Sequence, residues 1–172
     1  MGRVVGEIKV ERFLENLIQQ LPYEMKGKQE FMYRFEQNNS MCSIGYEKNK
    51  TFFSKAYNLT VKIEKEVQSA NAEKQEVRYL FHRQKWTSKK ESPLLKIANR
   101  HFRWKWNEID LEKLTMVEEK QKRTFKMSIL PGSYNVLLFP PLTQGIELYP
   151  NELKCLVNWI DVISKQLDGQ YL

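Results

Sequence analysis

The stretch "TFKMSILPGSYNVLLF", residues 124–139, carries the clearest strand pattern of the chain, and the predicted fold is built outward from it. Apolar side chains at positions 125, 127 and 129 alternate with polar ones, which is the period of a strand with one buried face. Pro131 and Gly132 are typical turn residues, and "YNVLLF" follows as an apolar run suited to a buried central strand. We therefore predict a β-hairpin here, within an antiparallel sheet.

Strand patterns of the same kind occur in the N-terminal half. Residues 31–35 and 41–46 are separated by the turn sequence "NNS" and predict a second hairpin. Residues 57–63 and 77–81 both alternate apolar and polar side chains, and the polar stretch "QSANAEKQ" connects them. We expect these two strands to pair with each other in an antiparallel manner.

Two later segments give weaker signals. Residues 110–122 fit two structures, because Asp110 could cap a helix whereas "LTMV" could begin a strand. Ile146 and Leu148 predict a short edge element after the break at Pro140 and Pro141.

Apolar residues at helical spacing mark both ends of the chain. The N-terminal helical face consists of Phe13, Leu14, Leu17, Ile18 and Leu21. Pro22 ends this pattern, and a C-terminal helix is expected to begin at Pro150 or Asn151. Its apolar face consists of Leu153, Leu156, Val157, Ile160, Ile163 and Leu167. Ser92 and Pro93, a good N-cap and first helical residue, predict a short helix between the two.

These elements predict an α+β fold. We expect residues 1–172 to form a single domain, with an antiparallel sheet of about six or seven strands, an N-terminal amphipathic helix and a C-terminal helix packed on the sheet. The chain has no apolar run of the roughly 18–20 residues that span a bilayer, and charges interrupt its first residues. We therefore expect a cytoplasmic protein.

The chain lacks the signatures of the common catalytic and metal sites. His82 and His101 have no neighbouring nucleophile motif, and Cys42 and Cys155 are too far apart in the sequence for a zinc or redox pair. The glycines form no phosphate-binding loop, and neither HExxH nor a calcium-loop pattern occurs. We therefore expect a non-enzymatic protein with two free thiols, no cofactor and no metal.

The positive charge of the chain is concentrated in one window. The formal net charge is +7, and residues 83–106 carry eight Lys or Arg and one acidic residue, Glu91, so the rest of the chain is neutral overall. The eight basic residues are Arg83, Lys85, Lys89, Lys90, Lys96, Arg100, Arg103 and Lys105. Lys and Arg neutralise phosphates, and neighbouring aromatic rings can stack on unpaired bases. We therefore expect an anionic partner, with nucleic acid favoured over an anionic membrane surface.

Two alternatives stay open. In "NRHFRWKW", residues 99–106, an extended chain places Phe102, Trp104 and Trp106 on the side opposite the cations, and a helix also separates most of the aromatics from the cations. The segment is then a structural strand or helix with an aromatic side in the core. The second alternative is a protein-interaction or small apolar-ligand domain, with a pocket between the sheet and the C-terminal helix.

Overall fold

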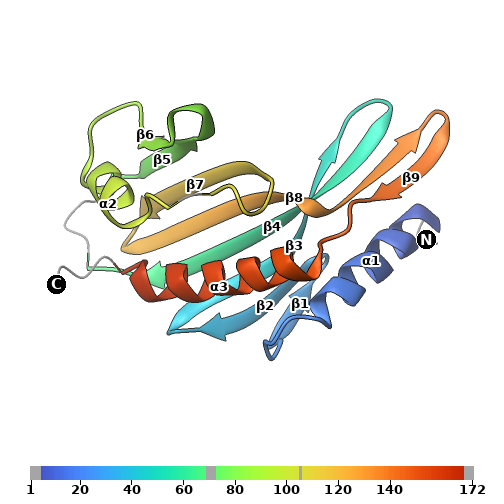
Figure 1. Ribbon diagram of the computed structural model, residues 1–172, viewed down its shortest axis with the longest axis horizontal. Coiled ribbons are helices and arrows are strands. Elements are labelled where there is room, and N and C mark those ends of the chain that lie inside the picture. Colours follow the sequence, from blue (N-terminus) through green and yellow to red (C-terminus); the bar gives the residue numbers. More distant parts are fainter. Residues whose placement is uncertain (1–4, 69–72, 105, 169–172) are drawn as a thin grey trace.

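The computed structural model describes residues 5–68, 73–104 and 106–168. Within this part of the chain the α+β prediction is confirmed, and the antiparallel sheet has nine strands where six or seven were expected (Figure 1). The strands are β1 (Gly27–Gln29), β2 (Met32–Gln37), β3 (Ser40–Lys50), β4 (Ser54–Glu66), β5 (Gln75–Leu80), β6 (Lys85–Thr87), β7 (Leu111–Glu119), β8 (Lys122–Leu138) and β9 (Pro141–Gly145). The helices are α1 (Val5–Ile18), the 3₁₀ turn η1 (Phe81–Arg83), α2 (Pro93–His101) and α3 (Pro150–Gln166).

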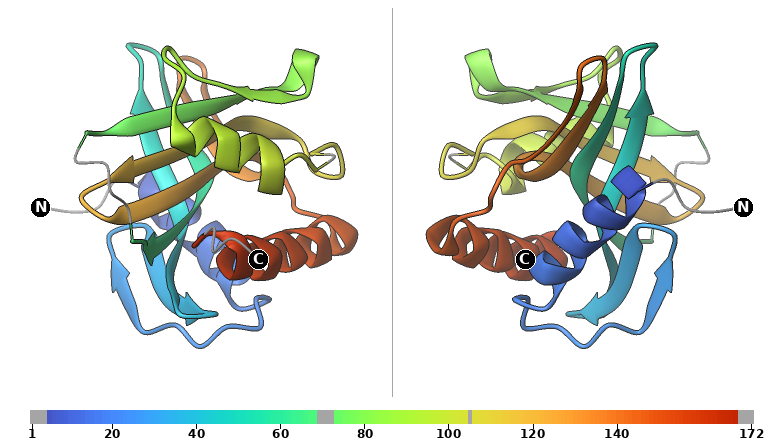
Figure 2. Two further views of the ribbon diagram at one scale, coloured as in Figure 1. Left: turned by 90° about the vertical axis from the view of Figure 1, so that its left-hand side faces the viewer. Right: turned by 90° about the vertical axis from the view of Figure 1, so that its right-hand side faces the viewer.

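The sheet has the strand order β1-β2-β3-β4-β8-β7-β5-β6, and β9 pairs with the far end of β8. It is strongly curved, and α1 and α3 both lie on its concave side (Figure 2). Leu14 of α1 and Leu156 and Ile160 of α3 are fully buried in the core that covers this side. The apolar faces predicted for the two terminal helices therefore meet one hydrophobic core.

The prediction of a hairpin at residues 124–139 is wrong. β8 continues through the expected turn residues Pro131 and Gly132 as one strand of 17 residues. Tyr57 of β4 pairs with Tyr134, but Leu59 pairs with Ile129, so residues 130–133 form a bulge in the ladder. Ser133 closes the gap: its Oγ donates to Ile129 O at 2.7 Å and accepts from Leu59 N at 2.9 Å. The bulge therefore bends the strand without reversing it.

Gly132 is required at the bulge. Its φ of 81° lies in the left-handed region, and a Cβ atom there would come within 2.6 Å of Leu59 Cδ2. Its amide donates to Ile146 O at 2.6 Å, and the amide of Leu130 donates to Asp110 O at 2.9 Å. In a local turn, the amides of Leu130 and Gly132 would bond to neighbouring residues. Here they bond to residues that are distant in the sequence.

Two further predictions about strands need correction. The strands at 57–63 and 77–81 do not pair with each other, because β8 and β7 lie between β4 and β5. The predicted edge element at Ile146 and Leu148 lies earlier, in β9. The ambiguous segment 110–122 contains strand β7.

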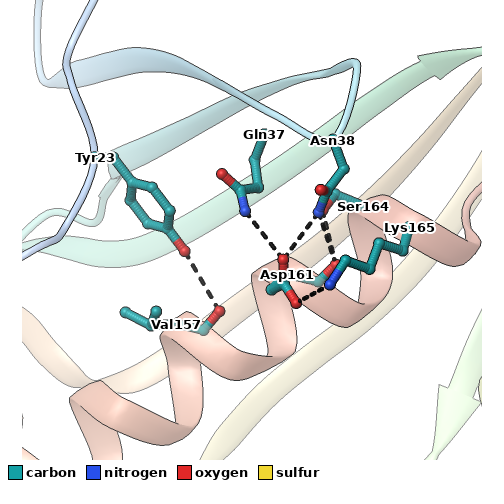
Figure 3. Close-up of polar contacts among 7 residues, drawn as sticks. All are labelled: Tyr23, Gln37, Asn38, Val157, Asp161, Ser164 and Lys165. Carbon is teal, nitrogen blue, oxygen red and sulfur yellow. Dashed lines mark hydrogen bonds and ion pairs between the residues drawn. The ribbon is translucent and has the colours of Figure 1, made fainter.

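The hairpin expected around "NNS" is confirmed, and its turn holds α3. Asn38 and Asn39 have φ of 51° and 58°, as a tight hairpin turn requires. Asn38 Nδ2 donates to Asp161 Oδ1 at 3.0 Å and to Ser164 Oγ at 2.8 Å (Figure 3). Lys165, Asn38 and Gln37 all donate to the Asp161 carboxylate, which lowers its pKa to about 2. These hydrogen bonds attach the turn to the C-terminal half of α3.

A second set of polar contacts holds the C-terminal end of α3. Arg123 is only 4% exposed and forms an ion pair with buried Glu118 at 2.7 Å. Its Nη1 also donates to Leu167 O at 2.6 Å, and Lys65 Nζ donates to Ser164 O at 3.1 Å. Arg123 and Lys65 face each other on adjacent strands. Two cations therefore satisfy carbonyl groups that the end of a helix leaves unpaired.

Candidate functional site

Strand β6 forms one edge of the sheet, and Trp86 at its centre holds α2 in place. The buried Trp86 side chain donates from Nε1 to Phe102 O at 2.7 Å, and its backbone amide donates to Asn99 Oδ1 at 3.2 Å. At the other end of α2, Ser92 caps the helix by accepting from Leu95 N at 3.2 Å, as the sequence predicts. Ser92 therefore caps the start of α2, and Trp86 holds its end against β6.

The aromatic residues of "NRHFRWKW" belong to the core. α2 ends at His101, and Phe102 and Trp106 are buried while Trp104 is half-buried. The Trp106 ring lies 5.0 Å from that of Trp159 on α3. After His101 the described residues 102–104 and 106 form neither a strand nor a helix, but the interpretation that the aromatics of this segment are core residues holds. The buried rings of Phe102 and Trp106 therefore offer no open stacking platform to a base.

The cations of the window point outward. All seven described members of the predicted site (Arg83, Lys85, Lys89, Lys90, Lys96, Arg100 and Arg103) are exposed, whereas Lys105 lies outside the described residues. Lys96 approaches Glu91 at 4.0 Å. The other six have no carboxylate of a described residue within 4.0 Å. Basic side chains on the central strands are mostly paired, for example Lys48 with Glu7 at 2.8 Å and Lys126 with Glu47 at 2.6 Å.

The structure separates two of these lysines from the rest. Lys89 and Lys90 lie on the loop between β6 and α2 and line an open cleft of about 780 Å³ with residues 73–76. Glu73, Glu76 and Glu91 line the same cleft. Its charge is therefore mixed, as on an ordinary solvated surface.

Four of the remaining cations lie toward the opposite end of β6, and we call them the basic edge: Arg83, Lys85, Arg100 and Arg103. Lys85 pairs with Leu80 at the end of β5, and Arg83 ends the preceding 3₁₀ turn. Arg100 lies in the last turn of α2, which ends against Trp86. Burial raises the pKa of the Tyr79 hydroxyl, and the positive charge of Arg103 opposes part of this increase.

No acidic residue occurs in the sequence around the basic edge, from position 77 to 90 or from 92 to 107. Lys96 lies one helical turn before Arg100 on the exposed side of α2 and extends the basic edge toward the cleft. The basic edge is therefore the part of the predicted site with the least mixed charge.

The two cysteines lie in surroundings that favour the neutral thiol. Both cysteines are free thiols; Cys42 is buried and Cys155 is half-buried, and burial raises the pKa of each thiol to about 12. Cys155 Sγ also donates to the Glu108 carboxylate at 2.8 Å, which favours the neutral thiol further. Within the described residues, no group of three or more His, Cys, Asp or Glu side chains is placed to hold a metal ion.

The C-terminal helix borders neither the cleft at β6 nor a smaller cavity of about 310 Å³ beside α1. Trp159 and Ile163 of α3 are buried side chains of the core. An apolar-ligand domain would need a pocket between the sheet and α3. No observation on the described residues supports such a pocket. None of the described helices combines the length and the apolar character needed to cross a membrane.

Residues 16–167 match the model of a family described as "Protein of unknown function (DUF3156)". The chain belongs to this family. Neither the curated proteins nor the solved structures give a match. The part that matches DUF3156 includes the whole sheet, α2 and α3, and with them the basic edge.

Proposed function

We propose that this chain is a non-enzymatic, cytoplasmic binding protein whose basic edge contacts the phosphates of a nucleic acid. The observation that carries the proposal is that Arg83, Lys85, Arg100 and Arg103 are exposed at one end of β6 and have no carboxylate of a described residue within 4.0 Å. Unpaired cations on a fixed surface can neutralise phosphates and release counterions.

The proposal is for contact with the backbone of the nucleic acid. The rings of Phe102 and Trp106 are in the core, so base stacking is not part of it. Binding of this kind depends weakly on sequence and strongly on salt. An anionic membrane is the less favoured partner for this surface, because all large apolar side chains that are exposed in the described residues lie outside residues 73–104.

The test is fluorescence anisotropy with a labelled 20-nucleotide single strand and a 20-base-pair duplex at several salt concentrations. The basic-edge variant carries Glu at Arg83, Lys85, Arg100 and Arg103. The matched control carries Glu at Lys9, Arg12, Lys113 and Lys154, which are also exposed, have no described ion pair and change the net charge equally.

We expect the basic-edge variant to lose binding and the salt-dependence slope for the duplex to fall by about 3 to 4, since each phosphate contact contributes about 0.9. The control should bind like wild type. Lys89→Glu with Lys90→Glu should have a smaller effect, because three glutamates share the cleft with these lysines. If the control loses as much affinity as the basic-edge variant, net charge explains the binding and the site is refuted.

A further inference from the structure

A second exposed feature lies at the opposite end of the molecule from β6 and involves different residues. The hairpin β3–β4 and the hairpin β8–β9 project together from the body (Figure 1). Their ends expose six large apolar side chains, which we call the apolar tip: Phe52, Phe53, Leu137, Leu138, Phe139 and Leu142. Phe52 is 87% exposed and Phe139 is 81% exposed. The prediction that "YNVLLF" is a buried central strand is therefore wrong over its last three residues.

The two hairpin ends form one surface. Ser54 pairs with Leu137, and Leu138 N donates to Phe53 O at 2.9 Å, so the two loops are joined by backbone hydrogen bonds. The rings of Phe52 and Phe53 contact each other with centroids 4.8 Å apart. Scattered single apolar residues are ordinary on a protein surface, but a contiguous group of this kind marks an interaction site.

The backbone of the apolar tip leaves few polar groups free. Thr51 N donates to Ser54 O at 2.9 Å, and Ser54 N donates to Thr51 Oγ1 at 3.1 Å. Pro140 and Pro141, at the turn of the second hairpin, have no N–H group at all. Satisfied or missing donors lower the cost of moving a loop into an apolar medium.

The charge behind the apolar tip is positive. Residues 48–56 and 135–146 contain three lysines and no acidic residue. Lys48 and Lys55 share the single carboxylate of Glu7, at 2.8 and 4.0 Å, and Lys50 has no carboxylate of a described residue within 4.0 Å. Basic residues next to apolar side chains are the combination that binds an anionic lipid surface.

We propose that the apolar tip inserts into the surface of a lipid bilayer that contains anionic lipids, with Lys50 at the headgroups. A second copy of the chain is the less suitable occupant, because a two-fold contact through this surface would bring the same lysines of both copies together. The site is independent of the basic edge and of the nucleic acid proposed there.

The test is flotation of the full chain with vesicles of phosphatidylcholine and phosphatidylglycerol in a 7:3 ratio, and with vesicles of phosphatidylcholine alone. The tip variant combines Phe52→Ser and Phe139→Ser, whose side chains are almost fully exposed, so folding is preserved. The matched control combines Met41→Ser and Leu130→Ser, two exposed apolar residues away from the tip. Thermal melts verify that all variants are folded.

We expect wild type and the matched control to bind the anionic vesicles within about twofold of each other. The tip variant should bind at least about tenfold more weakly, since burial of two Phe side chains is lost. Lys50→Glu should weaken binding by about fivefold or more. Phe52→Trp should show blue-shifted emission that brominated lipids quench.

Three results would overturn the proposal. The first is a wild-type chain that does not bind anionic vesicles. The second is a tip variant that binds anionic vesicles as well as wild type does. This result includes the case in which the basic-edge variant loses vesicle binding and the tip variant does not. The third is a wild-type dimer in sedimentation velocity that the tip variant dissociates, which would make a second copy the occupant. Nucleic-acid binding by the tip variant is measured separately, so failure of one proposal does not affect the other.

Discussion

Replacing Arg123 by Met tests how the sheet holds the end of α3. Arg123 and Glu118 are only 4% and 6% exposed, and the Arg123 guanidinium also donates to Leu167 O. Arg123→Met leaves a buried carboxylate without its cation and a helix carbonyl without its donor. Breaking a buried pair in this way costs about 3–5 kcal/mol, so we expect a loss of about 4 kcal/mol in the free energy of unfolding. In a chain of this length that corresponds to a fall in Tm of about 8–16 °C.

Urea denaturation and thermal melts followed by circular dichroism measure this loss. Lys122→Met is the matched control, because its ion pair with Glu64 is at the surface and contributes at most about 1 kcal/mol. The double variant Arg123→Met with Glu118→Met removes both charges and should recover at least half of the lost stability. The reasoning is refuted if Arg123→Met costs no more than the control, or if the double variant is less stable than Arg123→Met alone.

Three further outcomes follow from single residues. The pKa of Asp161 is about 2 in the folded chain, below the ~3.9 of an unfolded aspartate. Its stabilisation is therefore complete above pH ~4 and is lost as the pH falls toward 2. Melts across this range should show a difference between wild type and Asp161→Asn that shrinks with falling pH; a constant difference would contradict the assignment. Gly45→Ala places a Cβ within 1.8 Å of Phe31 O, so urea unfolding should show a loss above about 3 kcal/mol, and a loss below about 1 kcal/mol would argue against this packing. In a Cys155→Ser background, Cys42 should react with a thiol reagent at pH 8 more than about a hundredfold slower than an unfolded thiol, since burial raises its pKa to about 12; rapid labelling of the folded chain would disprove its burial.

The features that the sequence predicted correctly are those that neighbouring residues determine. The cap at Ser92 depends on an amide three residues away, and the turn at Asn38 and Asn39 depends on their own backbone angles. The apolar faces of the terminal helices follow from spacing within one helix. A short window of sequence contains all the residues on which such caps, turns and helix faces depend.

The features that were missed depend on distant partners. Pro131 and Gly132 are turn residues in isolation, yet their segment forms a bulge because Ser133 bonds to Leu59 and Gly132 bonds to Ile146. The pairing of β4 with β8 likewise joins residues that are 56 to 83 positions apart, which alternation of polar and apolar residues cannot indicate.

The same distinction applies to the candidate sites. The sequence identified the exposed cations, because basic side chains in a stretch with a single acidic residue stay in water. It could not show that Glu73 and Glu76 line the same cleft as Lys89 and Lys90, since these acids come from the start of β5 and the residues just before it. It also assigned Leu137 and Phe139 to the core, because an apolar run gives no sign of whether another layer covers it.

The central position of β8 has a consequence for how the chain is made. β8 lies between β4 and β7, although both of these strands precede it in the sequence. A growing chain therefore releases β4 and β7 from the ribosome while the strand that joins them is still being synthesised. Until the partner residues in β8 have emerged, which are 122–129 for β7 and 122–137 for β4, each of the two has an unpaired edge next to a buried apolar face. Such edges favour pairing with other chains. The sheet is completed late in synthesis, and α3 covers it only after that.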